Sequence, residues 1–172
     1  MSQRRGLVFA MAVLGAYALA GLFGGWMWHE LWQPSAGVVV DHQWYADGNA
    51  LREEFSGTAL YVLVSAGIGL VLGVVFALVG GVRPMLTLLT CVAGALLAGW
   101  LMARLGQRLG PADPAELALR AEDGTRLPSA LTVSGLTPQL SFALGSLAAL
   151  GAIFTLFSGK APEATFAAEP RG

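Results

Sequence analysis

Four long stretches without a charged residue constrain this chain more than any other feature of its sequence: 6–28, 55–82, 84–103 and 127–159. A hydrocarbon core about 30 Å thick is crossed by about 20 apolar residues in an α-helix, and every stretch reaches that length. The chain is 55% hydrophobic and 12% charged, whereas soluble domains carry about 25% charged residues. We therefore expect an integral membrane protein.

The first stretch differs from a cleaved signal peptide. Arg4 and Arg5 match the positive start of such a peptide, but 6–28 is longer than its apolar core of about 7–15 residues. Bulky Trp26 and Trp28 also stand where small residues should precede a cleavage site. We expect this stretch to be a retained helix, and we expect its tryptophans, together with Trp32, to form an aromatic belt at headgroup level.

The fold class that we predict is an all-α membrane protein, a four-helix transmembrane bundle with two extracytoplasmic loops. We expect the helices at about 7–28, 58–79, 85–104 and 138–157. The outer loops are then about 29–57 and 105–137, and 1–160 form a single domain, followed by a disordered cytoplasmic tail at 161–172. The Gly80-Gly81 pair and Pro84, suited to a helix end and a helix start, predict a tight hairpin between helices two and three.

Both outer loops contain residues that favour β-structure. The run 38–45 is rich in β-formers and is followed by Asp47-Gly48, a turn signal, and by 49–55, which suits a short interfacial helix. In the second loop, 117–120 and 131–133 are strand candidates. Because both loops must lie on one side of the membrane, we predict that they meet as a small β-containing cap.

The positive-inside rule does not decide the orientation by count. With the N-terminus inside, the inner cations are Arg4, Arg5, Arg83, Lys160 and Arg171, and the outer cations are Arg52, Arg104, Arg108, Arg120 and Arg126. The first helix usually dominates, and its start is flanked by two arginines. We therefore expect a multi-pass plasma-membrane protein with both termini in the cytoplasm.

Apart from Arg104 at the end of the third, no Asp, Glu, Lys, Arg or His lies inside the four expected helices. Proton-coupled transporters usually place such groups at membrane depth, so their absence argues against that class. The serines and threonines there are expected to bond to carbonyls of their own helix. Cys91 is the only cysteine, which excludes a disulfide within the chain. We assign no catalytic, cofactor-binding or metal-binding residue, and we expect no cofactor and no nucleic-acid partner.

Two groups of charged residues are candidate sites. The candidate metal ligands are His29, Glu30, Asp41, His42, Glu53 and Glu54. Their spacing matches no metal motif, so we interpret them as ordinary loop residues. Arg104 and Arg108 lie one helical turn apart, where they could snorkel, hold anionic lipid headgroups or pair with loop carboxylates such as Asp113.

Small residues recur four positions apart in three of the expected helices. The pairs are Gly21 with Gly25, Gly69 with Gly73, and Ala95 with Gly99. Such spacing lets helix backbones approach closely. The pairs could pack within the monomer, or they could form a face for a membrane-protein partner or a second copy of the chain.

Several short motifs together resemble a family of small four-helix integral membrane proteins of actinobacteria, a family without an assigned function. They are 31–34 (Leu-Trp-Gln-Pro), 83–84 (Arg-Pro), 104–106 (Arg-Leu-Gly) and 109–111 (Leu-Gly-Pro), followed by a Leu-Pro loop and a fourth helix. The resemblance implies a plasma-membrane protein with two external loops. It implies no activity and no functional residues.

The sequence is compatible with three functions. The first is a non-enzymatic accessory or assembly subunit that acts through helix and loop contacts with a partner. The second is a small oligomeric transporter or channel component, for which Gly67–Gly73 would be the best place for a break in a helix. The third is an envelope enzyme that uses His29, His42, Asp41 or Glu53.

Overall fold

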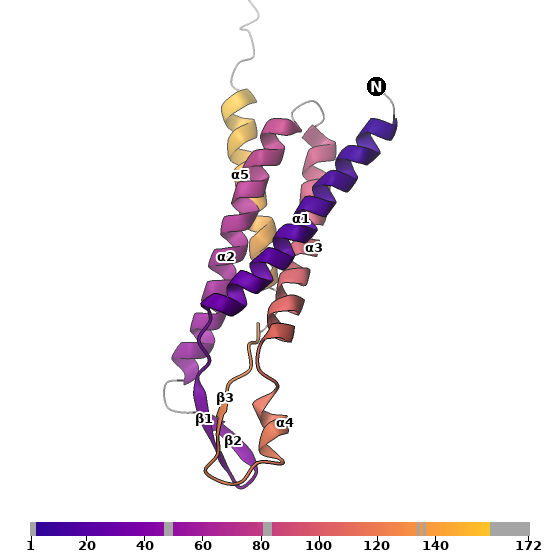
Figure 1. The fold of residues 1–172 in the computed structure, drawn as a ribbon. Coiled ribbons are helices and arrows are strands. Elements are labelled where there is room, and N and C mark those ends of the chain that lie inside the picture. The colour runs from indigo at the N-terminus through magenta and orange to yellow at the C-terminus, as the bar shows by residue number, and fades with distance from the viewer. Residues whose placement is uncertain (1–2, 47–49, 81–83, 134, 136, 159–172) are drawn as a thin grey trace, which may run out of the picture.

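Four long helices form one bundle, and a small cap covers one end of it (Figure 1). The computed structural model describes residues 3–46, 50–80, 84–133, 135 and 137–158. The long helices are α1 (Gln3–Leu31), α2 (Ala50–Val79), α3 (Pro84–Leu109) and α5 (Ser141–Ser158), with the short 3₁₀ helix η1 (Pro138–Leu140) leading into α5. Each is apolar and long enough for a membrane span, the last together with η1. The predicted four-helix membrane fold is confirmed.

Two of the helices continue well past the expected membrane boundaries. α2 begins at Ala50 rather than near 58, so the short interfacial helix that we expected at 49–55 is part of the same helix. α3 begins at Pro84, as expected, but ends at Leu109 rather than 104. Leu, Arg, Glu and Gln at these ends are good helix formers, so the helices do not stop where the charged residues begin.

The helices pack as two parallel pairs. α1 packs mainly against α3, and α2 packs mainly against α5. α1 and α3 both run towards the cap, and α2 and α5 both run away from it (Figure 1). The chain therefore consists of two halves, each with a helix, a loop and a second helix. The first helices of the two halves contact each other, and so do the second helices.

Small residues allow the paired backbones to approach closely. A Cβ added at Gly21 would lie 2.5 Å from the carbonyl oxygen of Ala98, and one added at Gly69 would lie 2.3 Å from that of Phe142. All six residues that the sequence singled out are buried: Gly21, Gly25, Gly69, Gly73, Ala95 and Gly99. The glycines among them contact other helices of the same chain, which is the packing within the monomer that we considered.

The hairpin between α2 and α3 closes at Gly80. Its N–H donates to the carbonyl of Phe76 at 2.8 Å, and its own carbonyl accepts from Thr87 Oγ1 at 3.0 Å. Gly80 thus follows the end of α2, as predicted. Gly81 and Arg83, the other residues expected at this turn, lie outside the described residues.

The cap joins the two loops through one antiparallel sheet. Its strands are β1 (Ala36–Val40), β2 (Gln43–Ala46) and β3 (Arg126–Pro128), in the order β2-β1-β3. Backbone bonds at Val39 extend the pairing, because its N–H donates to Thr125 at 3.0 Å and its carbonyl accepts from Gly124 at 2.8 Å. The predicted β-containing cap is confirmed, and it ties the first half of the chain to the second (Figure 1).

The expected β-run at 38–45 is divided by a turn. Asp41 and His42 have φ values of 50° and 58°, and they connect β1 to β2. Positive φ at both central residues is the geometry of a two-residue type I′ hairpin turn, which aspartate tolerates better than most residues. The turn that we expected at Asp47-Gly48 lies outside the described residues.

Both strand predictions in the second loop are wrong. Residues 117–120 do not form a strand, because α4 (Pro114–Ala118) occupies the first part of this run. Asp113 caps α4 by accepting a bond from the N–H of Ala115 at 2.9 Å, and proline follows as the first helical residue. The other expected strand, 131–133, is irregular, and its Leu131 is buried against the bundle core.

The close contact at Gly69 generates a stability prediction. Gly69→Ala places a Cβ against the Phe142 carbonyl and should destabilise the protein by about 1–3 kcal/mol, since backbone must move. Gly67→Ala in the same helix is the control, because a Cβ there meets nothing within 4 Å. The control should be neutral or stabilising by up to about 1 kcal/mol. Unfolding in mixed detergent micelles measures both, and equal effects would contradict the packing of α2 against α5.

Candidate functional site

Polar side chains at membrane depth are paired with each other between helices. Tyr17 of α1 bonds through its hydroxyl to Ser146 Oγ of α5, and both side chains are buried. The Tyr17 ring stacks on Phe76 with centroids 5.7 Å apart and lies 5.9 Å from the ring of Phe142. This cluster therefore connects three helices, including α1 and α5, which belong to different pairs.

The serines and threonines only partly follow the expectation that they bond to their own helix. Thr90 and Thr155 do so, donating to the carbonyls four residues earlier at 2.7 Å and 2.9 Å. Ser65 and Ser141 bond to local carbonyls and also to each other across the contact between α2 and α5. For Ser146 the expectation is wrong, since its recorded bond joins another helix.

Aromatic residues close the bundle at the cap end. Trp28 is fully buried, donates from Nε1 to the Gly57 carbonyl at 2.9 Å, and contacts the ring of Tyr61 edge to face at 5.1 Å. Tyr61 donates from its hydroxyl to the Gly99 carbonyl at 2.8 Å. Trp28 was expected in an interfacial aromatic belt, but its indole is part of the core.

The structure does not bring the described candidate metal ligands together. His29 lies in the last turn of α1, with a buried Nδ1 that has no hydrogen-bond partner among the described residues. Asp41 and His42 lie at the exposed hairpin turn, at the far end of β1 from α1. Glu53 and Glu54 lie outside the residues whose side chains are described. Within the described part of the chain, no three His, Cys, Asp or Glu side chains form a metal site.

The two arginines of α3 lie near the junction of bundle and cap. The Arg104 guanidinium lies 5.3 Å from the centre of the exposed Trp100 ring, a cation–π contact. Arg108 lines an open hollow together with Asp113, but no ion pair between them is formed. The structure thus places the Arg104 side chain against an aromatic ring of its own helix.

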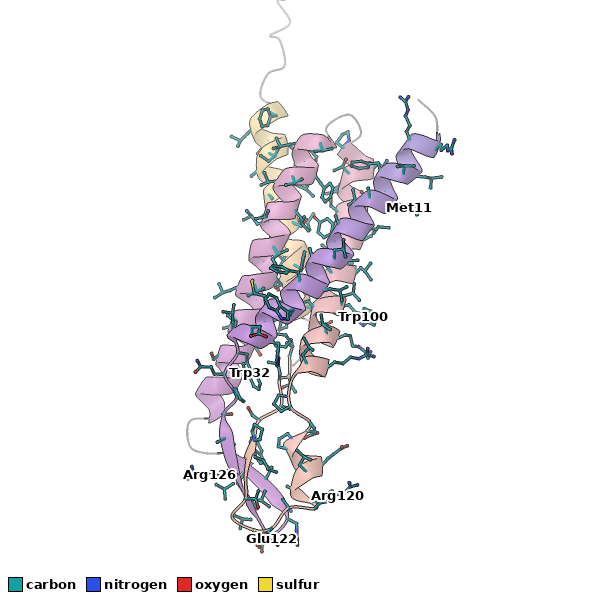
Figure 2. The ribbon with its side chains drawn as sticks, viewed as in Figure 1. Met11, Trp32, Trp100, Arg120, Glu122 and Arg126 are labelled. Atoms are coloured by element: carbon teal, nitrogen blue, oxygen red, sulfur yellow. The ribbon has the colours of Figure 1, made fainter. Side chains whose placement is uncertain are left out.

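A cavity of about 250 Å³ lies where the cap meets the bundle. Trp32, which follows α1, marks its place in Figure 2. The lining combines two indoles, one carboxylate and small polar or apolar groups: Trp32, Ser35, Trp44, Ala46, Gly57, Asp113, Pro114, Ala115, Ser129, Ala130, Leu131 and Thr132. Residues from both loops and from both halves of the chain thus build one cavity.

This cavity is the strongest candidate site in the described part of the chain, and we did not predict it from the sequence. Trp32 was expected in an aromatic belt, and Asp113 entered only as a partner for arginine. The Asp-Pro pair at 113–114, which starts α4, was a readable signal for the helix that carries this carboxylate. No sequence signal indicates that Trp44, from the other loop, would lie beside it.

The comparisons with known proteins add no relative. No family model, no curated protein and no solved structure matches this chain. The resemblance to actinobacterial four-helix membrane proteins stays a prediction.

The bond between Tyr17 and Ser146 generates a second prediction. Tyr17→Phe and Ser146→Ala each remove it while leaving most of the packing, so a double-mutant cycle isolates the interaction. We expect a coupling energy of about 0.6 kcal/mol and at most about 1.7 kcal/mol, the range of interhelical bonds in membranes. Unfolding of the four variants in mixed micelles measures it. Strictly additive effects would show that the bond does not stabilise the bundle.

Proposed function

We propose that this chain is a non-enzymatic accessory or assembly subunit of a membrane complex. In this proposal it lies in the plasma membrane with both termini in the cytoplasm, and it contacts its partner through the cap and the outer faces of the helices. The observation that carries the proposal is the apolar surface of the cap. Leu119 is 69% exposed and Tyr45 is 54% exposed, and both lie outside the candidate membrane spans. Leu119 directly follows α4 and Tyr45 lies in β2, and these two elements contact each other.

Exposed apolar side chains outside the membrane favour a protein contact. Val40 of β1 is a further large hydrophobic residue of the cap with substantial exposure. Apolar surface that is exposed outside the membrane typically marks an interaction site. β2 is also an edge strand of the sheet, and among the described strands none pairs with its outer side, so a strand of another protein could pair there.

Contacts inside the membrane would use the outer helix faces. The small-residue pairs are occupied within the chain, whereas large side chains such as Met11 and Trp100 lie on the outside of the bundle (Figure 2). The transporter alternative has less support. α2 continues as a regular helix through Gly67–Gly73, where that alternative expected a break, and the buried hydroxyls are paired.

A pull-down tests the proposal. A tag on the C-terminal tail and extraction in mild detergent should recover a membrane partner at a fixed ratio. Leu119→Glu should reduce that recovery at least about tenfold, because a charge replaces an apolar contact. Arg120→Gln, at the adjacent exposed position, is the matched control and should retain the partner. Recovery of only a homo-oligomer would contradict the proposal and favour the transporter alternative.

Cysteine labelling tests the orientation. Cys91 is fully buried and should not react with a membrane-impermeant maleimide, so the unsubstituted chain is the background. Glu122→Cys, at the cap (Figure 2), should be labelled in intact cells. Pro84→Cys, at the opposite end, should be labelled only after permeabilisation. The reverse pattern would contradict cytoplasmic termini while leaving the fold intact.

A further inference from the structure

We propose that the cavity between cap and bundle binds an organic ammonium cation, held between the indoles of Trp32 and Trp44 and the carboxylate of Asp113. The inference goes beyond the proposed accessory function and does not depend on it. It rests on three properties of the cavity, which are its aromatic walls, the sign of its charge and its position relative to the membrane.

Both indoles are held in place by contacts with the chain. Trp44 donates from Nε1 to the Leu127 carbonyl at 3.2 Å, and its ring lies so close to Gly37 that an added Cβ there would be 2.4 Å away. The Trp32 ring lies against Gly57, where an added Cβ would be 3.2 Å from Nε1. Tryptophan is the side chain whose ring attracts cations most strongly, and fixed rings lose little entropy on binding.

Among the described residues that line the cavity, Asp113 is the only ionisable one, so the charge that they provide is negative. An anion would meet no positive side chain among them. One of its oxygens caps α4 through Ala115, and no ion pair to it is formed within the described residues. A divalent metal would require several oxygen ligands, commonly more than one carboxylate. One carboxylate between two indoles suits an organic ammonium ion better.

The size and position of the cavity restrict further which ligands could bind there. A volume of about 250 Å³ accommodates a small cation of the size of tetramethylammonium or ethanolamine, not a large molecule. The walls include the residue just after α1 and the start of the membrane span of α2, so the cavity lies at headgroup level. The ammonium group could therefore come from a lipid headgroup or from a free amine in solution.

The first arm of the test uses free cations. The full chain in uncharged maltoside micelles is dialysed to equilibrium against radiolabelled tetramethylammonium. Asp113→Asn removes the charge but keeps a capping side chain, so α4 should persist, and it should weaken binding by about three- to fivefold. Glu116→Gln removes the same charge from α4 without touching the cavity, and it should leave binding unchanged.

The aromatic wall is tested by Trp32→Leu, which should weaken tetramethylammonium binding by about two- to tenfold. Trp32 is the better choice because Trp44 also bonds within the cap. Equal binding constants for Asp113→Asn, Glu116→Gln and Trp32→Leu would overturn the proposal. It would also be overturned if neither the unsubstituted chain nor any variant showed saturable binding, both here and in the lipid experiment below.

The second arm separates the two sources of the cation. Native mass spectrometry of the same micelles records the retention of phosphatidylethanolamine and phosphatidylglycerol. Preferential retention of phosphatidylethanolamine that is lost in Asp113→Asn and displaced by tetramethylammonium supports the proposal with a lipid headgroup as ligand. Equal retention of the two lipids, together with Asp113-dependent binding of the free cation, supports it with a soluble amine as ligand.

Discussion

Close approach of parallel helices is the interaction on which the rest of this structure depends. Lipid chains are as apolar as leucine, so burial of apolar surface does not hold helices together inside a membrane. Dispersion between closely packed backbones does so, and it needs small residues at the contact. Gly21 against Ala98 and Gly69 against Phe142 provide this in the two pairs. Both loops emerge at the same end of the bundle because two spans, α2 and α3, separate them, and the pairing of equivalent helices brings the two halves together there.

Hydroxyl pairs make this packing specific. A hydroxyl buried in hydrocarbon is unfavourable unless it forms a hydrogen bond, so its partner restricts which helix faces can meet. Tyr17 with Ser146 and Ser65 with Ser141 restrict α5 relative to α1 and α2. These residues are thus structural, although polar groups at membrane depth are often the first candidates for transport or catalysis.

The cap extends the pairing of the two halves beyond the membrane. β1 comes from the first loop and β3 from the second, so their hydrogen bonds hold both loops at a fixed position at one end of the bundle. The reversal at Asp41 and His42 directs β2 back towards α4. The cavity with Trp32 arises at this junction, where neither the bundle nor the sheet fills the space completely.

The sequence by itself determined that four helices cross a membrane, since an apolar run of about 20 residues satisfies all its backbone hydrogen bonds within itself only as a helix. It also determined the tight hairpin at Gly80 and Pro84 and the presence of β-structure in the first loop, because these depend on local backbone preferences. Only the tertiary structure decided which faces pair, that the small residues pack within the chain, and that Trp44 and Asp113 line one cavity. Those contacts join residues far apart in the chain, and no local preference specifies which distant surface a side chain will meet.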